Sequence, residues 1–207
     1  MPKRVLNYLV QLTITISCIF IFNTDVNSSV IQDYTEFNFN SKEEFISLED
    51  NWGFYWNKLL EAKDLKRHQA DTFIQISTTW NKLSFLEIPL SAYGYATYHK
   101  RIVVDHSNVK VLAFDLPAVY SSHRFWVNDQ LVAENGVVAK SKEDYEPHWK
   151  PITVSVSPQK DTLDLILQIA NFDHYIGGIA RPIEMGNPSV LFNFREKIVA
   201  SQTIMAG

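Results

Sequence analysis

Alternating polar and apolar residues dominate the chain from about residue 33 onward, and this pattern predicts strands. Residues 163–170 place leucine or isoleucine at nearly every second position, as in a strand with one buried face. Further strand-like runs cover residues 33–40, 52–56, 72–77, 95–104, 109–116, 124–133 and 152–156. About eight short strands without a long helix between them predict an all-β fold, an antiparallel β-sandwich.

Short helices are expected only at the edges of this sandwich. Ser41 stands three residues before Glu44, the spacing of a capping box, so residues 41–50 predict a short helix. Residues 58–66 predict one or two further helical turns.

Three local features give sharper expectations. Residues 127–131 predict a tight hairpin, because the Asn-Asp pair at its centre tolerates positive φ. Trp52, Phe54 and Trp56 alternate along one strand, so their side chains should be buried on one face. The pair Gly177–Gly178 predicts positive φ or a close backbone approach.

The two ends of the chain differ from the middle. Residues 1–28 read as an export signal, because Lys3 and Arg4 precede an almost uncharged run, although an uncleaved membrane anchor also fits. Residues 33–188 would form the sandwich. Residues 189–207 read as a juxtamembrane segment that runs into a truncated transmembrane helix, with a short amphipathic helix on the sandwich as the alternative.

Composition narrows the class of protein. The 207 residues carry a net charge of −4, which argues against a nucleic-acid partner. The single cysteine, Cys18, excludes an intramolecular disulfide framework.

Four segments, in order, resemble the sugar-binding jelly roll at the front of family 2 glycoside hydrolases. They are residues 94–100, 125–132 (with Trp-Val-Asn-Asp), 167–171 and 177–186 (Gly-Gly-Ile-Ala-Arg-Pro-Ile). The resemblance implies a galactose-binding-like jelly roll. Asp129 stands where that family usually has glycine, which leaves the turn type open.

With its flanks, the chain also resembles the extracytoplasmic part of bacterial seven-transmembrane receptors with diverse intracellular signalling modules. This second resemblance implies a sensor domain at the periplasmic face of the inner membrane, attached through helices that follow the chain, with a homodimer as a further expectation. The alternatives are a carbohydrate-binding module of a truncated family 2 type glycosidase and a structural module for docking or dimerisation.

Candidate ligand-binding residues follow from the chemistry of sugars, whose C–H faces stack on aromatic rings and whose hydroxyls need hydrogen-bond partners. Mixed aromatic and polar stretches occur at residues 145–150 and 171–175, and a polar stretch at 120–124 would be either part of a concave site or the solvent face of an edge strand. The residues expected to contact a carbohydrate or a related small ligand are His123, Arg124, Tyr145, His148, Trp149, Asp173 and Tyr175.

The alternative for Trp149 is a role in packing instead of ligand contact. In that case Pro147 and Pro151 would pin residues 134–150 as a lid over the core, with the indole pointing inward.

Catalysis is not expected. Glycoside hydrolysis needs two opposed carboxylates in a rigid frame, and the acidic residues here fall mostly in turns and at edges. The six histidines are widely spaced and show no helical i, i+4 pair, so the sequence predicts no metal and no cofactor.

Overall fold

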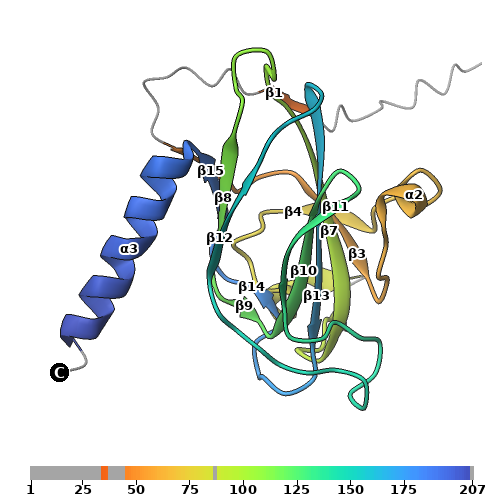
Figure 1. Cartoon of the computed structure of the whole chain (residues 1–207). Helices are drawn as coiled ribbons and strands as arrows, with labels where there is room; N and C mark the ends of the chain where they lie inside the picture. Colours follow the sequence, from red (N-terminus) through yellow and green to blue (C-terminus); the bar gives the residue numbers. More distant parts are fainter. Residues whose placement is uncertain (1–33, 37–44, 86–87, 206–207) are drawn as a thin grey trace, which may run out of the picture. The chain divides into compact units, whose positions relative to one another are not determined.

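The structure is a computed structural model that describes residues 34–36, 45–85 and 88–205. The predicted export signal and the capping-box residues Ser41 and Glu44 lie outside the described residues. Within the described part, the fold is an antiparallel β-sandwich of the jelly-roll type, as predicted (Figure 1).

The larger sheet contains the longest strands. Its order is β11 (Gln130–Asn135), β10 (Ser122–Val127), β13 (Thr162–Asn171), β7 (Gly94–Val103), β3 (Trp52–Trp56) and β4 (Thr72–Ile74). These neighbours are antiparallel, whereas β1 (Tyr34–Glu36) pairs in parallel with β7.

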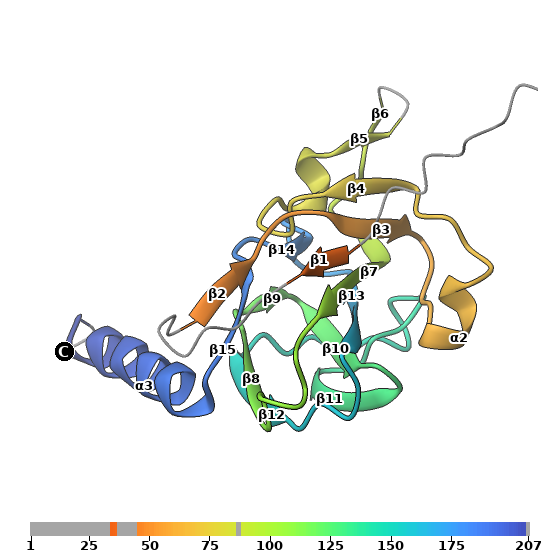
Figure 2. The ribbon, with the colours of Figure 1, turned by 90° about the horizontal axis from the view of Figure 1, so that it is seen from above.

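The smaller sheet faces it. Its order is β12 (Ile152–Val156), β8 (Leu112–Leu116), β15 (Ile183–Gly186) and β2 (Phe45–Leu48). Two short ribbons pair β9 (Val119–Tyr120) with β14 (Gly178–Ile179), and β5 (Ser84–Phe85) with β6 (Ile88–Pro89). Figure 2 shows the two main sheets as separate layers, with α3 (Pro188–Met205) on the side of the smaller one.

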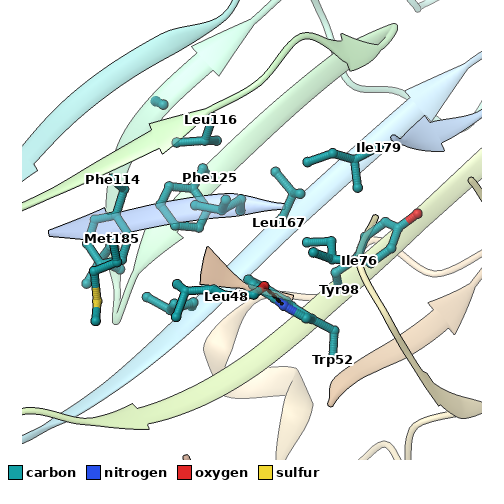
Figure 3. Packing of buried hydrophobic residues seen from close by; sticks show 14 of the residues in the cluster. Leu48, Trp52, Ile76, Tyr98, Phe114, Leu116, Phe125, Leu167, Ile179 and Met185 are labelled. Carbon is teal, nitrogen blue, oxygen red and sulfur yellow. Dashed lines mark hydrogen bonds between the residues drawn. The ribbon is translucent and has the colours of Figure 1, made fainter. Parts of the chain in front are cut away.

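The core lies between the two layers. Phe114 of the small sheet meets Phe125 of the large sheet edge to face, with ring centroids 5.5 Å apart. Leu48, Met185 and Trp52 extend the same cluster (Figure 3). The buried face predicted for residues 163–170 is confirmed in β13. Its members in this core are Leu163, Leu165, Leu167 and Ile169.

Most predicted strands are present, and the hairpin is confirmed. Val127 pairs with Gln130, so Asn128 and Asp129 form the two-residue turn. Asn128 has φ 57° and is the only turn residue with positive φ, which is the pattern of a type II′ turn. Asn128 also binds Asp164, donating from its backbone N–H at 2.7 Å and accepting at Oδ1 at 3.0 Å. Since the positive φ falls on Asn128, Asp129 is tolerated where the resembling family has glycine.

The aromatic strand β3 is also confirmed. Trp52 and Phe54 are fully buried, and Trp56 is partly buried against Trp80 with ring centroids 5.2 Å apart. Tyr55 on the other face is buried as well, so β3 is covered on both sides.

The short helix predicted for residues 41–50 is wrong where the structure describes that segment. Residues 45–48 form strand β2, which pairs with β15 through Leu48↔Ile183 and Phe45↔Gly186. The pairing partner lies far along the chain, and this long-range contact overrides the local helix signal. The second predicted helical segment is confirmed as the short helix α2 (Ala62–Leu65), and a 3-10 turn, η1 (Trp80–Lys82), was not predicted.

Residues after β15 form α3. In the described part of the chain, no helix combines the length and the apolar character required to span a bilayer. A transmembrane helix beginning near Ile198 therefore stays a prediction.

Candidate functional site

A group of four rings, two of them exposed, lies where β9, the end of β13 and the loop before β12 meet. Tyr120 stacks on His174 with centroids 4.6 Å apart and planes 13° apart, and Trp149 lies 5.2 Å from His174. Tyr175 adjoins His174 at 4.6 Å. We call Tyr120, Trp149, His174 and Tyr175 the rim cluster. Trp149 is 55% exposed and Tyr175 is 73% exposed, so the cluster presents aromatic surface to solvent.

A buried amide holds the loop that carries His174 and Tyr175. Asn171 Nδ2 donates to the carbonyls of Ala92 (2.8 Å), His174 (2.7 Å) and Ile176 (3.0 Å). Its Oδ1 accepts from the backbone N–H of His174 at 3.0 Å and from Ser121 Oγ at 2.9 Å. Asn171 is fully buried, so this loop is pinned from inside the fold.

The loop that carries Trp149 is fixed in a similar way. The backbone N–H of His148 donates to the Ser121 carbonyl at 2.9 Å, and Asn135 Nδ2 donates to the Lys150 carbonyl at 2.7 Å. Gly136 has φ 66°, and a Cβ there would lie 2.2 Å from the Glu146 carbonyl oxygen, so only glycine fits. Trp149 is therefore held outward by its own loop, contrary to the inward-pointing alternative.

The same loop does cover part of the large sheet. Val138 and Tyr145 are buried beside Ala170 and pack with Tyr95 and Phe172, forming a small second apolar cluster. Ala170 alternates with the core residue Ile169 along β13, so residues 134–150 cover the outer face of the large sheet and not the core between the sheets, as the lid interpretation had it.

The structure brings some of the predicted site residues together. Trp149 and Tyr175 belong to the rim cluster. Asp173 is next to it and pairs with Lys142 at 3.0 Å. His148 is exposed beside Trp149.

Three other predicted residues lie elsewhere. Tyr145 is buried, with its ring 5.4 Å from that of Phe172. Arg124 pairs with Glu134 across β10 and β11 at 2.6 Å. His123 is fully buried, so its ring does not meet solvent.

The location of His123 corrects the interpretation of residues 120–124. β10 lies between β11 and β13, so it is an inner strand and not an edge strand. His123 shares a strand face with Phe125 and Val127, which belong to the core. Neither ring nitrogen has a hydrogen-bond partner among the described residues, and burial lowers the pKa of His123 to about 4.

Sequence reasoning missed three contributors to this site. Tyr120 and His174 supply the stacked pair at its centre, and Asn171 supplies the anchor. The signal was partly visible, because Asn171 begins the mixed stretch 171–175, but only the fold brings Tyr120 and Trp149 next to it.

Two hollows in the described part of the chain lie at the β10–β11 hairpin, and neither is lined by a residue of the rim cluster. One is lined by residues 61–63, Trp126, Asn128 and Asp129, the other by residues 127–130, 156–160 and Leu163. Within the described part of the chain, no three histidine, cysteine or acidic side chains gather as metal ligands.

Comparison with known proteins supports the fold. No protein-family model and no curated protein sequence matches this chain. Among solved structures it is similar to a glycosyl hydrolase family 2 member from Bacteroides cellulosilyticus (TM-score 0.53, 16% identity), covering 70% of this chain and 20% of that one.

Two other similar structures are a family 2 β-galacturonidase from Eisenbergiella tayi bound to galacturonate and a β-glucuronidase from Bacteroides uniformis. Their TM-scores are 0.50 and 0.51, at 13% and 16% identity. They are matched over 72% and 69% of this chain but only 25% and 17% of theirs. The chain thus spans at most a quarter of these enzymes, and the likeness shows a shared jelly-roll fold.

Proposed function

We propose that this chain is the non-catalytic, extracytoplasmic ligand-binding module of a bacterial membrane signalling receptor, and that it binds carbohydrate at the rim cluster. Residues 1–28 would direct export, residues 33–188 would sense the ligand at the periplasmic face of the inner membrane, and residues 189–207 would lead toward the membrane. This assignment rests on the resemblance of the whole arrangement to seven-transmembrane receptors.

The observation that carries the ligand proposal is the exposure of Trp149 and Tyr175 on loops that are firmly held. Exposed aromatic rings gathered at one place are typical of a binding surface. Their faces suit the C–H faces of a sugar, and Asp173, Lys142 and His148 supply polar groups beside them. The fold of the neighbours, in enzymes named for galacturonate and glucuronide chemistry, supports including sugar acids among the candidates.

Trp149→Ala is expected to weaken saccharide binding about fivefold or more, because losing a stacking face costs about 1 kcal/mol. Isothermal titration calorimetry with neutral sugars and uronic acids measures this. The melting temperature should change little, since Trp149 is half exposed.

Phe73→Ala is the matched control, because Phe73 is an exposed aromatic residue on β4, outside the rim cluster. It should bind like wild type. The proposal fails if no sugar gives a saturable heat, or if Trp149→Ala binds as well as wild type does.

The fold of the neighbours favours one rival, a carbohydrate-binding module of a family 2 type glycosidase. The gene sequence beyond Gly207 separates the two. Apolar spans support the receptor, whereas the strands and helices of an enzyme barrel support the glycosidase.

A further inference from the structure

Helix α3 covers the outer face of the small sheet. It packs against β8, β12 and β15. Leu191 is fully buried, and Phe194 lies 5.2 Å from Phe45 between ring centroids. Figure 1 shows the helix alongside β8 and β15.

One buried ion pair fastens the helix to this sheet. Arg195 Nε donates to Asp115 Oδ1 at 2.8 Å, and Arg195 Nη2 donates to Asp115 Oδ2 and to the Leu116 carbonyl. Thr153 Oγ1 donates to Asp115 Oδ1 at 2.6 Å. The Asp115 and Arg195 side chains are both mostly buried, and the Nε–Nη2 edge of the guanidinium is committed to β8.

A second carboxylate lies next to this pair. Glu184 of β15 is directly opposite Asp115 of β8, and directly opposed residues of neighbouring strands share a face. Its Oε2 is buried and accepts no hydrogen bond from the described residues. Two acidic side chains therefore lie side by side on the sheet face that α3 covers, and Arg195 is bonded to one of them, Asp115.

Two neighbouring strands bring charged and polar groups to Glu184. β8 supplies Asp115, and β2 supplies Ser47 with Glu49 just after it, whereas Arg195 of α3 is bonded to Asp115. Burial first, and then the charges of Asp115 and Glu49, raise the pKa of Glu184, while the Ser47 hydroxyl opposes this. Glu184 is thus easiest to accommodate in its neutral form.

We propose that α3 is a releasable element of the fold, held to the small sheet by Arg195 and Asp115 and loosened when Glu184 loses its proton. An ionised Glu184 would place a second negative charge under the helix, where Arg195 is already committed. Release exposes Glu184 to water, and its pKa then returns toward the ordinary value. Docking is therefore strongest at acidic pH and weakens as the pH rises through the raised pKa of Glu184.

Hydrogen exchange of the α3 amides in the full chain tests this. A released 18-residue helix is marginal in water, so release should appear as lost protection in peptides covering residues 188–201. Between pH 5 and pH 8, after correction for intrinsic exchange, wild-type protection should fall roughly threefold or more. The reason is that each unit by which the pKa of Glu184 differs between the docked and released states changes the docking equilibrium about tenfold.

Three variants test whether Glu184 and Arg195 cause this change in protection. Glu184→Gln should keep high protection with no pH dependence. Glu196→Gln, a change at an exposed acid on the same helix, should behave like wild type. Arg195→Gln should show low protection at every pH. A flat wild-type profile overturns the proposal without any variant, and so does a wild-type pH dependence that persists in Glu184→Gln.

Discussion

Gly177→Ala is expected to destabilise the protein by about 3 kcal/mol or more, at the upper end for overpacked sites. A Cβ at Gly177 would lie 2.1 Å from Trp80 Nε1 and 2.4 Å from the Ala92 carbonyl oxygen. Neither neighbour is free to move. Trp80 is fully buried, its Nε1 donates to the Ala92 carbonyl at 3.1 Å, and its backbone N–H donates to the Gly177 carbonyl at 3.0 Å. Urea unfolding followed by circular dichroism measures the loss.

Gly53→Ala is the matched control for this substitution. Gly53 is also a buried glycine, but its added Cβ would meet its nearest neighbour, Ala70 Cβ, at an ordinary 3.4 Å. Gly53→Ala should therefore lower the free energy of unfolding much less than Gly177→Ala does. An unchanged urea midpoint for Gly177→Ala would show that the close approach has been misjudged.

His123 is expected to make the protein sensitive to mild acid. The free energy of unfolding should fall by about 3 kcal/mol between pH 6.5 and pH 4. Burial lowers the pKa of His123 to about 4, from an ordinary value of 6.5. In this interval the unfolded chain binds a proton that the folded protein does not. The stabilisation is thus complete above pH 6.5 and disappears as the pH falls through this window.

Urea unfolding at a series of pH values measures the effect. His123→Leu should flatten the profile between pH 6.5 and pH 4, because the buried ring no longer has to stay neutral. His148→Gln is the control, since His148 is exposed, and its profile should follow wild type. Asp164 contributes mainly below this window. Burial alone would raise its pKa, but His99 and Arg101 lower it from 3.8 to about 2, so its stabilisation is lost as the pH falls below about 4. A wild-type profile that is flat above pH 4 would contradict the expectation.

Local patterns predicted the strands well because their side-chain alternation is a property of a few neighbouring residues. The alternation in β13 and the Asn128 turn needed no knowledge of the rest of the chain. β2 could not be predicted in this way, since it is a strand only by virtue of its pairing with β15.

The candidate site was likewise predictable from the sequence only where the signal is local. Trp149 and Tyr175 stand out as aromatic residues in polar stretches, and both prove to be exposed. His123 stood out for a similar reason, but whether a polar residue on a strand faces water or the core depends on where that strand lies in the sheet. The contact between Tyr120 and His174 joins two distant segments, so no local pattern reports it.

The chain runs from the rim cluster to α3 through two short strands. After His174 the chain passes through β14 and β15 and enters α3 at Pro188. β14 is bonded to β9, which carries Tyr120, and β15 is bonded on both sides, to β8 and β2. Residues 180–182 lie between these two strands, and Asn187 precedes the helix. The rim cluster and α3 are thus the two ends of one short stretch of chain, whose first strand is held by β9 and whose second is held by β8 and β2.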